Sequence, residues 1–99
     1  MQFDWDEFNI AHIAKHDVMP HEAEGVITNN PLDLGYVLRN GEDRIVQVGE
    51  TLNGRVLVVV STLRAEKTRV VSARSADRKH RLQYQRMMEQ QNAREENPS

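Results

Sequence analysis

The apolar run VLVVV at residues 56–60 constrains the fold more than any other feature of the sequence. An uninterrupted apolar segment rich in β-branched valine suits a strand that is buried on both faces, in the middle of a sheet. This strand is expected to span residues 55–62. The Asn53-Gly54 pair just before it is a strong turn signal, because both residues adopt positive φ readily. The sequence therefore predicts a sheet with this segment near its centre.

Three other segments alternate apolar and polar residues, as half-buried strands do. They lie at residues 34–38, 44–50 and 68–73. Turn signals at residues 39–41 and 65–67 separate neighbouring segments along the chain. Because short connections join strands that run in opposite directions, we expect about four mainly antiparallel strands.

Helical signals flank this β-rich region. Asp6 is placed to cap a helix that runs through Ala14, and Pro20 is placed to begin a second helix that ends before Asn29. The buried positions expected on these two helices are Ile10, Ile13, Ala14, Ala23, Val26 and Ile27, with Glu22 and Glu24 outside. A third helix is expected from residue 76 to about residue 91, with Ser75 as its N-cap. Together with a short strand at residues 3–5, these elements predict an α+β fold.

The length of 99 residues allows one domain, which is expected to cover residues 1–91. The last segment, NAREENPS at residues 92–99, has alanine as its only apolar residue and is expected to be a disordered tail. No run approaches the roughly 18 apolar residues of a membrane span, so no membrane contact is expected. The chain has no cysteine, which removes disulfides and thiolate metal sites and favours a cytoplasmic setting.

Positive charge is concentrated in one part of an acidic chain. Residues 64–86 hold eight lysine and arginine residues against two acidic ones, although the whole chain has a net charge of −2. This segment covers the last expected strand and the start of the last helix, so a basic cleft is expected at their junction. Arginine pairs with phosphate oxygens through two parallel hydrogen bonds, which makes such a cleft suitable for nucleic acid.

His12 and His16 are four residues apart in the first expected helix. At this spacing, two imidazoles on one helix face can bind a metal ion. Pro20 interrupts the helix before His21, however, so the sequence shows no third ligand in a suitable position. We therefore expect no metal site and no cofactor.

Several short motifs occur in a fixed order along the chain. It opens with Phe3-Asp4-Trp5-Asp6-Glu7, and its first helix ends with Lys15-His16-Asp17-Val18. Arg44 then precedes Val48-Gly49, and Arg69, Ser72, Ala73, Arg74 and Ala76 form an Arg-x-x-Ser-Ala-Arg-x-Ala block. Over residues 1–86 this pattern resembles the BrnT-type toxins of bacterial toxin–antitoxin pairs, although Asp17 stands where that family usually has glycine.

The resemblance implies a RelE-like fold and a metal-independent endoribonuclease activity that stops translation. It also implies neutralisation by a small ribbon-helix-helix (BrnA-like) antitoxin. RNA and this antitoxin are therefore the expected partners. A toxin dimer within the toxin–antitoxin complex is left open.

Metal-free RNA cleavage requires deprotonation of the ribose 2′-hydroxyl, neutralisation of the phosphorane and protonation of the leaving oxygen. Arg74, just before a helix N-terminus, is expected to stabilise the phosphorane. The candidate proton donors and acceptors are Lys15, His16 and Tyr84, and Tyr84 is also a candidate for stacking on a base. The residues expected to bind RNA are Arg44, Arg69, Arg78, Lys79 and Arg81.

Two other interpretations of the same charges stay open. A non-catalytic RelE-like binding module would use the cleft to hold an antitoxin or nucleic acid without turnover. Alternatively, the charges would form only a solvated surface.

Overall fold

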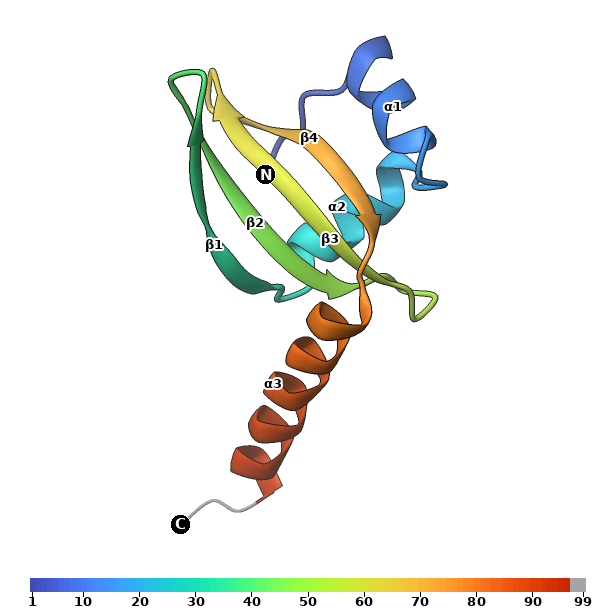
Figure 1. Ribbon diagram of the computed structural model, residues 1–99, viewed down its shortest axis with the longest axis vertical. Helices are drawn as coiled ribbons and strands as arrows, with labels where there is room; N and C mark the ends of the chain where they lie inside the picture. The colour runs from blue at the N-terminus through green and yellow to red at the C-terminus, as the bar shows by residue number, and fades with distance from the viewer. Residues whose placement is uncertain (97–99) are drawn as a thin grey trace.

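The computed structural model describes residues 1–96 and contains three helices and one four-stranded sheet. The elements follow in the order α1 (Glu7–Ala14), α2 (Pro20–Thr28), β1 (Leu32–Arg39), β2 (Glu42–Glu50), β3 (Val56–Arg64), β4 (Lys67–Ser75) and α3 (Arg78–Glu96) (Figure 1). The strands lie in the order β1-β2-β3-β4, and each neighbouring pair is antiparallel. Phe3 adds a single parallel bridge to Thr68. The predicted α+β class and the order of its elements are confirmed.

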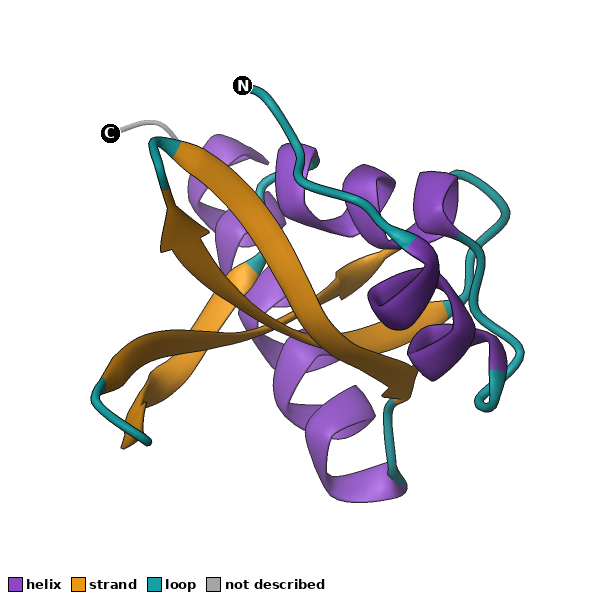
Figure 2. Ribbon diagram, turned by 90° about the horizontal axis from the view of Figure 1, so that it is seen from above, coloured by secondary structure: helices purple, strands orange, loops and turns teal. Residues whose placement is uncertain are grey.

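The main hydrophobic core lies between the first two helices and one face of the sheet. Figure 2 shows α1 and α2 on the same side of the twisted strands. The core consists of Ile13, Val18, Ala23 and Val26 packed with Leu57, Val59, Val70 and Ala73. Because β3 is paired on both sides and its Leu57, Val58 and Val59 are all buried, the prediction from the VLVVV run is confirmed. Each fully buried Leu or Val contributes about 1.5–3 kcal/mol.

The third helix covers only one end of the opposite face. Ala76 and Tyr84 pack there against Val48 and Val58, and α3 then extends away from the sheet (Figure 1). Toward the β1–β2 and β3–β4 turns, no helix of residues 1–96 covers this face.

Strand register decides which side chains share this uncovered surface, because residues paired directly across antiparallel strands lie on the same face. Val37, Arg44, Thr62 and Arg69 are paired in one row, and Val46, Val60 and Ser72 are paired in the next. Arg39 pairs with Glu42 at the turn end, where Glu42 also contacts Arg64. We call the surface formed by these residues the open face.

The boundaries of α3 differ from the predicted ones at both ends. Asp77, not Ser75, caps the helix, since its Oδ1 accepts the His80 N–H at 2.9 Å. The helix continues to Glu96, so residues 92–96 of the expected tail are helical, while residues 97–99 lie outside the described part. Within residues 1–96, no helix combines the length and apolar character needed to cross a membrane.

The prediction that Glu22 lies outside the protein is wrong, because its side chain closes a polar network between α2 and the sheet. Its carboxylate accepts hydrogen bonds from the Met19 N–H at 3.0 Å and from Arg55 Nη1 at 3.0 and 3.1 Å. Arg55 also donates to the Asp17 carbonyl and the Ser75 hydroxyl. The Met19 N–H, followed by Arg55, lowers the pKa of Glu22.

Helix α1 buries fewer residues than its periodicity predicted. Ile13 is fully buried, but Ile10 is 41% exposed and Ala14 is exposed. The reason is that α1 contacts mainly β4, at the edge of the sheet, so only a narrow stripe of the helix meets the core. The turn that follows places Asp17 at a φ of 57°, a left-handed conformation that favours glycine.

Replacement of glycine by alanine is expected to have opposite effects on stability at Gly49 and at Gly25. A Cβ on Gly49 would lie 2.9 Å from Val26 Cγ1 and 3.3 Å from Pro31 Cβ, whereas one on Gly25 would meet nothing within 4 Å. Gly49→Ala is therefore expected to lower the free energy of unfolding by about 1–3 kcal/mol. Gly25→Ala, inside α2, is expected to raise it by about 0.5–1 kcal/mol. Urea denaturation of both variants checks this, and equal effects at the two positions would contradict it.

Candidate functional site

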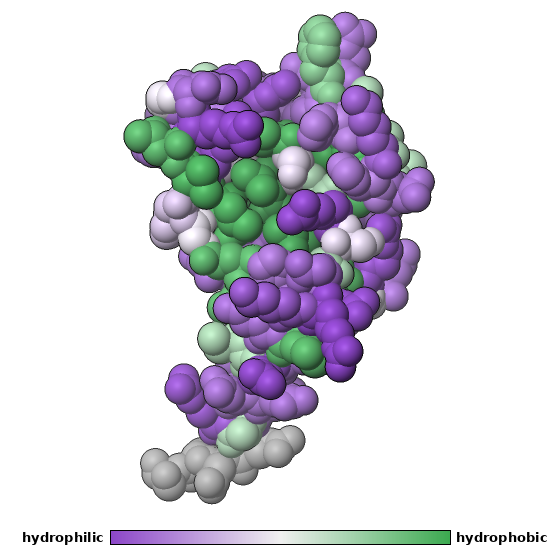
Figure 3. All heavy atoms as spheres, in the orientation of Figure 1, coloured by the Kyte–Doolittle hydropathy of each residue, from purple (hydrophilic) through white to green (hydrophobic). Residues whose placement is uncertain are grey.

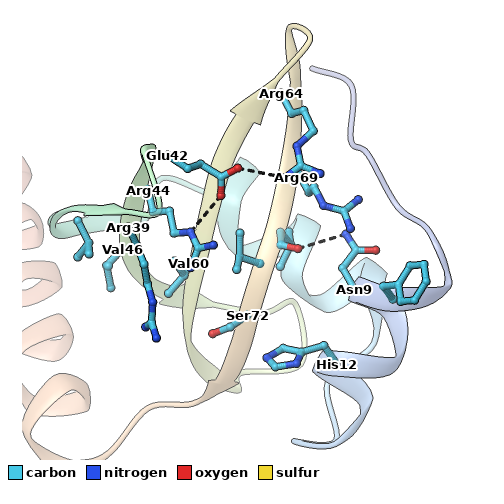
Figure 4. Close-up of a pocket in the computed structure, with 14 residues that line it drawn as sticks. Asn9, His12, Arg39, Glu42, Arg44, Val46, Val60, Arg64, Arg69 and Ser72 are labelled. Carbon is cyan, nitrogen blue, oxygen red and sulfur yellow. Dashed lines mark hydrogen bonds and ion pairs between the residues drawn. The ribbon is translucent and has the colours of Figure 1, made fainter.

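A cleft of about 680 Å³ lies on the open face and extends to the side of α1. Its lining comes from α1 (Phe8, Asn9, His12), β1 (Val37, Arg39), β2 (Glu42, Arg44, Val46), β3 (Val60, Arg64) and β4 (Arg69, Val70, Val71, Ser72). In Figure 4, side chains from α1 and the sheet strands surround this cleft. The cleft thus depends on the packing of α1 beside the β4 edge, which Asn9 fixes by donating from Nδ2 to the Val70 carbonyl at 3.2 Å.

One carboxylate organises two of the arginines that line the cleft. Glu42 Oε1 lies 3.1 Å from Arg44 Nε, and Glu42 Oε2 lies 3.0 Å from Arg64 Nη2 (Figure 4). Hydrogen bonds from Arg64 and then Arg44 lower the pKa of Glu42, so this carboxyl is ionised at neutral pH. Glu42 therefore holds both guanidinium groups at the turn end of the open face. Among the described residues, Arg39 has no such acidic partner.

Arg69 has a different environment, because it links the N-terminal segment to β4. Its Nη1 lies 3.0 Å from Asp6 Oδ2 and 3.5 Å from Asp4 Oδ2, and its side chain is only 12% exposed. The hydrogen bond from Arg69 is the largest cause of the lowered pKa of Asp6. Asp6 in turn caps α1. Two carboxylates thus offset the charge of Arg69, and its position supports the wall of the cleft.

The floor of the cleft is apolar. Val46 and Val60 face each other across β2 and β3, and Val37 and Val71 lie beside them. Val71 has no paired residue because a bulge interrupts the register between β3 and β4. Figure 3 shows hydrophobic residues gathered over the middle of this face, with hydrophilic residues around them. The cleft therefore combines an apolar floor with cationic walls.

Of the predicted catalytic residues, Arg74 lies on the same sheet face as the strand residues that line the cleft. It is paired with Val58, one row beyond Ser72 and Val60, and is exposed. It does not line the cleft. Arg44 and Arg69, both predicted to bind RNA, do line it.

Lys15 and His16 come directly after α1 and are exposed, outside the lining. The histidine that α1 places in the cleft lining is His12, one turn earlier. The His16 ring packs edge to face with that of His12, at 6.4 Å between centroids. Sequence reasoning considered His12 only as a metal ligand. In the described part of the chain, no three His, Cys, Asp or Glu residues form a possible metal site.

Tyr84, the candidate for proton transfer or base stacking, is buried. Its side chain is 5% exposed and packs in the second hydrophobic cluster with Val48 and Val58. Burial, and to a smaller extent the Glu50 carboxylate, raises the pKa of the Tyr84 hydroxyl. Tyr84 therefore stays protonated at neutral pH and anchors α3 to the sheet.

The prediction of a single basic cleft at the β4–α3 junction is wrong, because the cations of residues 64–86 lie on separate surfaces. Arg78 and Lys79 line a separate groove along α3, together with Arg86, and Arg81 lines neither surface. The cations are close together in sequence, but α3 extends away from the sheet (Figure 1). The sequence alone assigned no catalytic or RNA-binding role to Phe8, His12, Arg39, Glu42 or Arg64. The two-residue Asn40-Gly41 turn was the available signal, because it places Arg39 opposite Glu42.

Comparison with known protein families identifies a match over most of the chain. Residues 5–80 match the model of a family described as the ribonuclease toxin BrnT of type II toxin–antitoxin systems. The match runs from the N-terminal segment to the first turn of α3, and it includes every residue that lines the cleft. No curated protein matches the chain. The chain therefore belongs to the BrnT family of type II toxin–antitoxin ribonuclease toxins.

Proposed function

We propose that the chain is a metal-independent endoribonuclease that binds RNA in the cleft of the open face. The observation that carries this proposal is the presence of Arg39, Arg44 and Arg64 in the lining of one accessible cleft, which His12 lines from α1. Guanidinium groups stabilise phosphate oxygens as negative charge develops in the transition state. Arg74 lies on the same sheet face, which supports a contact between Arg74 and the RNA backbone beyond the cleft.

In the proposed reaction, the ribose 2′-oxygen attacks the adjacent phosphorus, and the 5′-oxygen of the next nucleotide leaves. Arg44 and Arg64 neutralise the phosphorane. The His12 imidazole accepts the proton of the 2′-hydroxyl and water protonates the leaving 5′-oxygen, or these two roles are exchanged. His16 supports the orientation of His12 through ring packing, and Lys15 adds positive charge at this end of α1.

RNA cleavage is expected to continue at its full rate in EDTA and to leave products with 2′,3′-cyclic phosphate ends. A substrate with a 2′-deoxy sugar at the cleaved position is expected to stay intact, because the nucleophile is missing. Gel analysis of labelled RNA with the purified protein measures both effects. Loss of cleavage in EDTA, or cleavage of the 2′-deoxy substrate at the same bond, would reject the mechanism.

We further propose that the antitoxin is of the ribbon-helix-helix type and that it prevents RNA from reaching the cleft. Coexpression of such a partner with the chain in bacteria tests this proposal. Restored growth supports it, and continued arrest with the two proteins bound to each other contradicts it.

A non-catalytic binding module is the second candidate, and the ion pairs of the cleft favour it. Glu42, Asp4 and Asp6 offset much of the charge on Arg44, Arg64 and Arg69. Such a module would hold RNA or the antitoxin without turnover. RNA binding by the purified chain without any cleaved product would support this candidate over the endoribonuclease.

A further inference from the structure

The cleft has an apolar floor in addition to the arginines that a phosphate would need. Phosphate oxygens need cationic or hydrogen-bonding partners and gain nothing from an apolar floor. A nucleotide, in contrast, combines a charged phosphate with a planar base that prefers apolar or aromatic contact. The valine floor between Arg44 and α1 therefore fits a nucleotide better than it fits a phosphate alone.

Phe8 lies on the α1 side of this cleft and is 73% exposed. Large aromatic side chains usually bury most of their surface, so an exposed one at the rim of a cationic cleft is a candidate for ligand contact. Its backbone is held in place, because its N–H donates to Asp6 Oδ1 at 2.9 Å and Asp6 pairs with Arg69. The ring is thus attached to a rigid part of the cleft wall.

We propose that Phe8 is a base-stacking platform for single-stranded RNA, with the RNA backbone on Arg44 and Arg64 and one base unstacked over the valine floor. This inference rests on the proposed function, since it takes RNA as the ligand. Bases in a duplex are stacked and paired, so their faces are not accessible to a phenyl ring. The site is therefore selective for unpaired RNA.

The chain provides a matched control in Tyr36. This aromatic residue is 77% exposed, but it pairs with Ile45 and lies on the opposite face from Val37 and Arg44. Removal of its ring changes the exposed aromatic surface by a similar amount without touching the cleft.

The test measures binding of the full chain to a labelled, unstructured oligonucleotide whose 2′-O-methyl groups prevent cleavage. Phe8→Ala is expected to weaken binding roughly 5- to 150-fold, the range for loss of one stacked base. Phe8→Trp keeps the affinity because it preserves a flat ring, while Phe8→Leu loses it. Tyr36→Ala leaves it unchanged, and binding of duplex RNA is weak for every variant.

If the parent chain binds and cleaves RNA and Phe8→Ala binds RNA with the same affinity, the inference about Phe8 fails while the proposed function stands. Full affinity of Phe8→Leu would show that a flat ring is not needed, which also overturns it. If Phe8→Ala weakens the antitoxin complex and not RNA binding, the surface serves a protein partner instead. If the parent chain binds no RNA, both the inference and the proposed function fail.

Discussion

Arg44→Ala is expected to lower the rate of RNA cleavage by roughly 10²-fold, the usual loss when one preorganised donor to a transition-state charge is removed. Arg44 lines the cleft and is held by Glu42 at 3.1 Å, so its guanidinium is already oriented before RNA binds. Cleavage of a labelled RNA under single-turnover conditions measures the effect. In bacteria, the same substitution is expected to relieve growth arrest.

Arg81→Ala is the matched control, because it removes one arginine from an exposed position on α3. This position lies outside both the cleft of the open face and the groove along α3. Its cleavage rate is expected to stay within about twofold of the parent rate, since a distant surface charge contributes little at moderate salt. Equal losses for the two variants would indicate a general electrostatic effect and contradict a specific role of Arg44. Thermal denaturation of both variants checks that each is folded.

Leu57→Ala is expected to lower the free energy of unfolding by about 2–5 kcal/mol, the range for buried leucine to alanine. Leu57 is fully buried at the centre of the main core, on a strand with neighbours on both sides. The substitution leaves a cavity that packed β-sheet and helix backbones cannot close. In a chain of this size such a loss removes a large part of the total stability, so partial unfolding at 37 °C is expected.

Leu52→Ala provides the comparison, because Leu52 is 95% exposed in the loop between β2 and β3. It is expected to change the free energy of unfolding by at most about 0.5 kcal/mol. Denaturation in urea, followed by circular dichroism, measures both variants. A small effect at position 57, comparable with that at position 52, would contradict the assigned core.

The fold was predictable because its signals are local. Alternation, the VLVVV run and the Asn-Gly turns each report on a few neighbouring residues, and they gave the correct order of strands. Helix ends were less predictable, because tertiary contacts decide them. Ser75 is a suitable cap by type, but its hydroxyl accepts a hydrogen bond from Arg55, and Asp77 caps α3 instead.

The candidate site was less predictable than the fold, because proximity in sequence did not become proximity in space. Arg69 and Arg78 are nine residues apart, yet one supports the cleft wall and the other lies along α3. Glu42 and Arg64 are far apart in sequence but in contact, because strand pairing joins them. Recognition of such a site requires the register of the whole sheet, which no single motif contains.

The pairing of Glu42 with Arg44 and Arg64 has a consequence for the empty protein. The molecule carries its own counterion in the place where a polyanion would bind, so an incoming strand has to compete with a resident carboxylate. Abundant cellular polyanions that offer only phosphate gain little from this exchange. A ligand that also covers the valines gains apolar contact in addition, so these ion pairs favour such a ligand over one that offers phosphate alone.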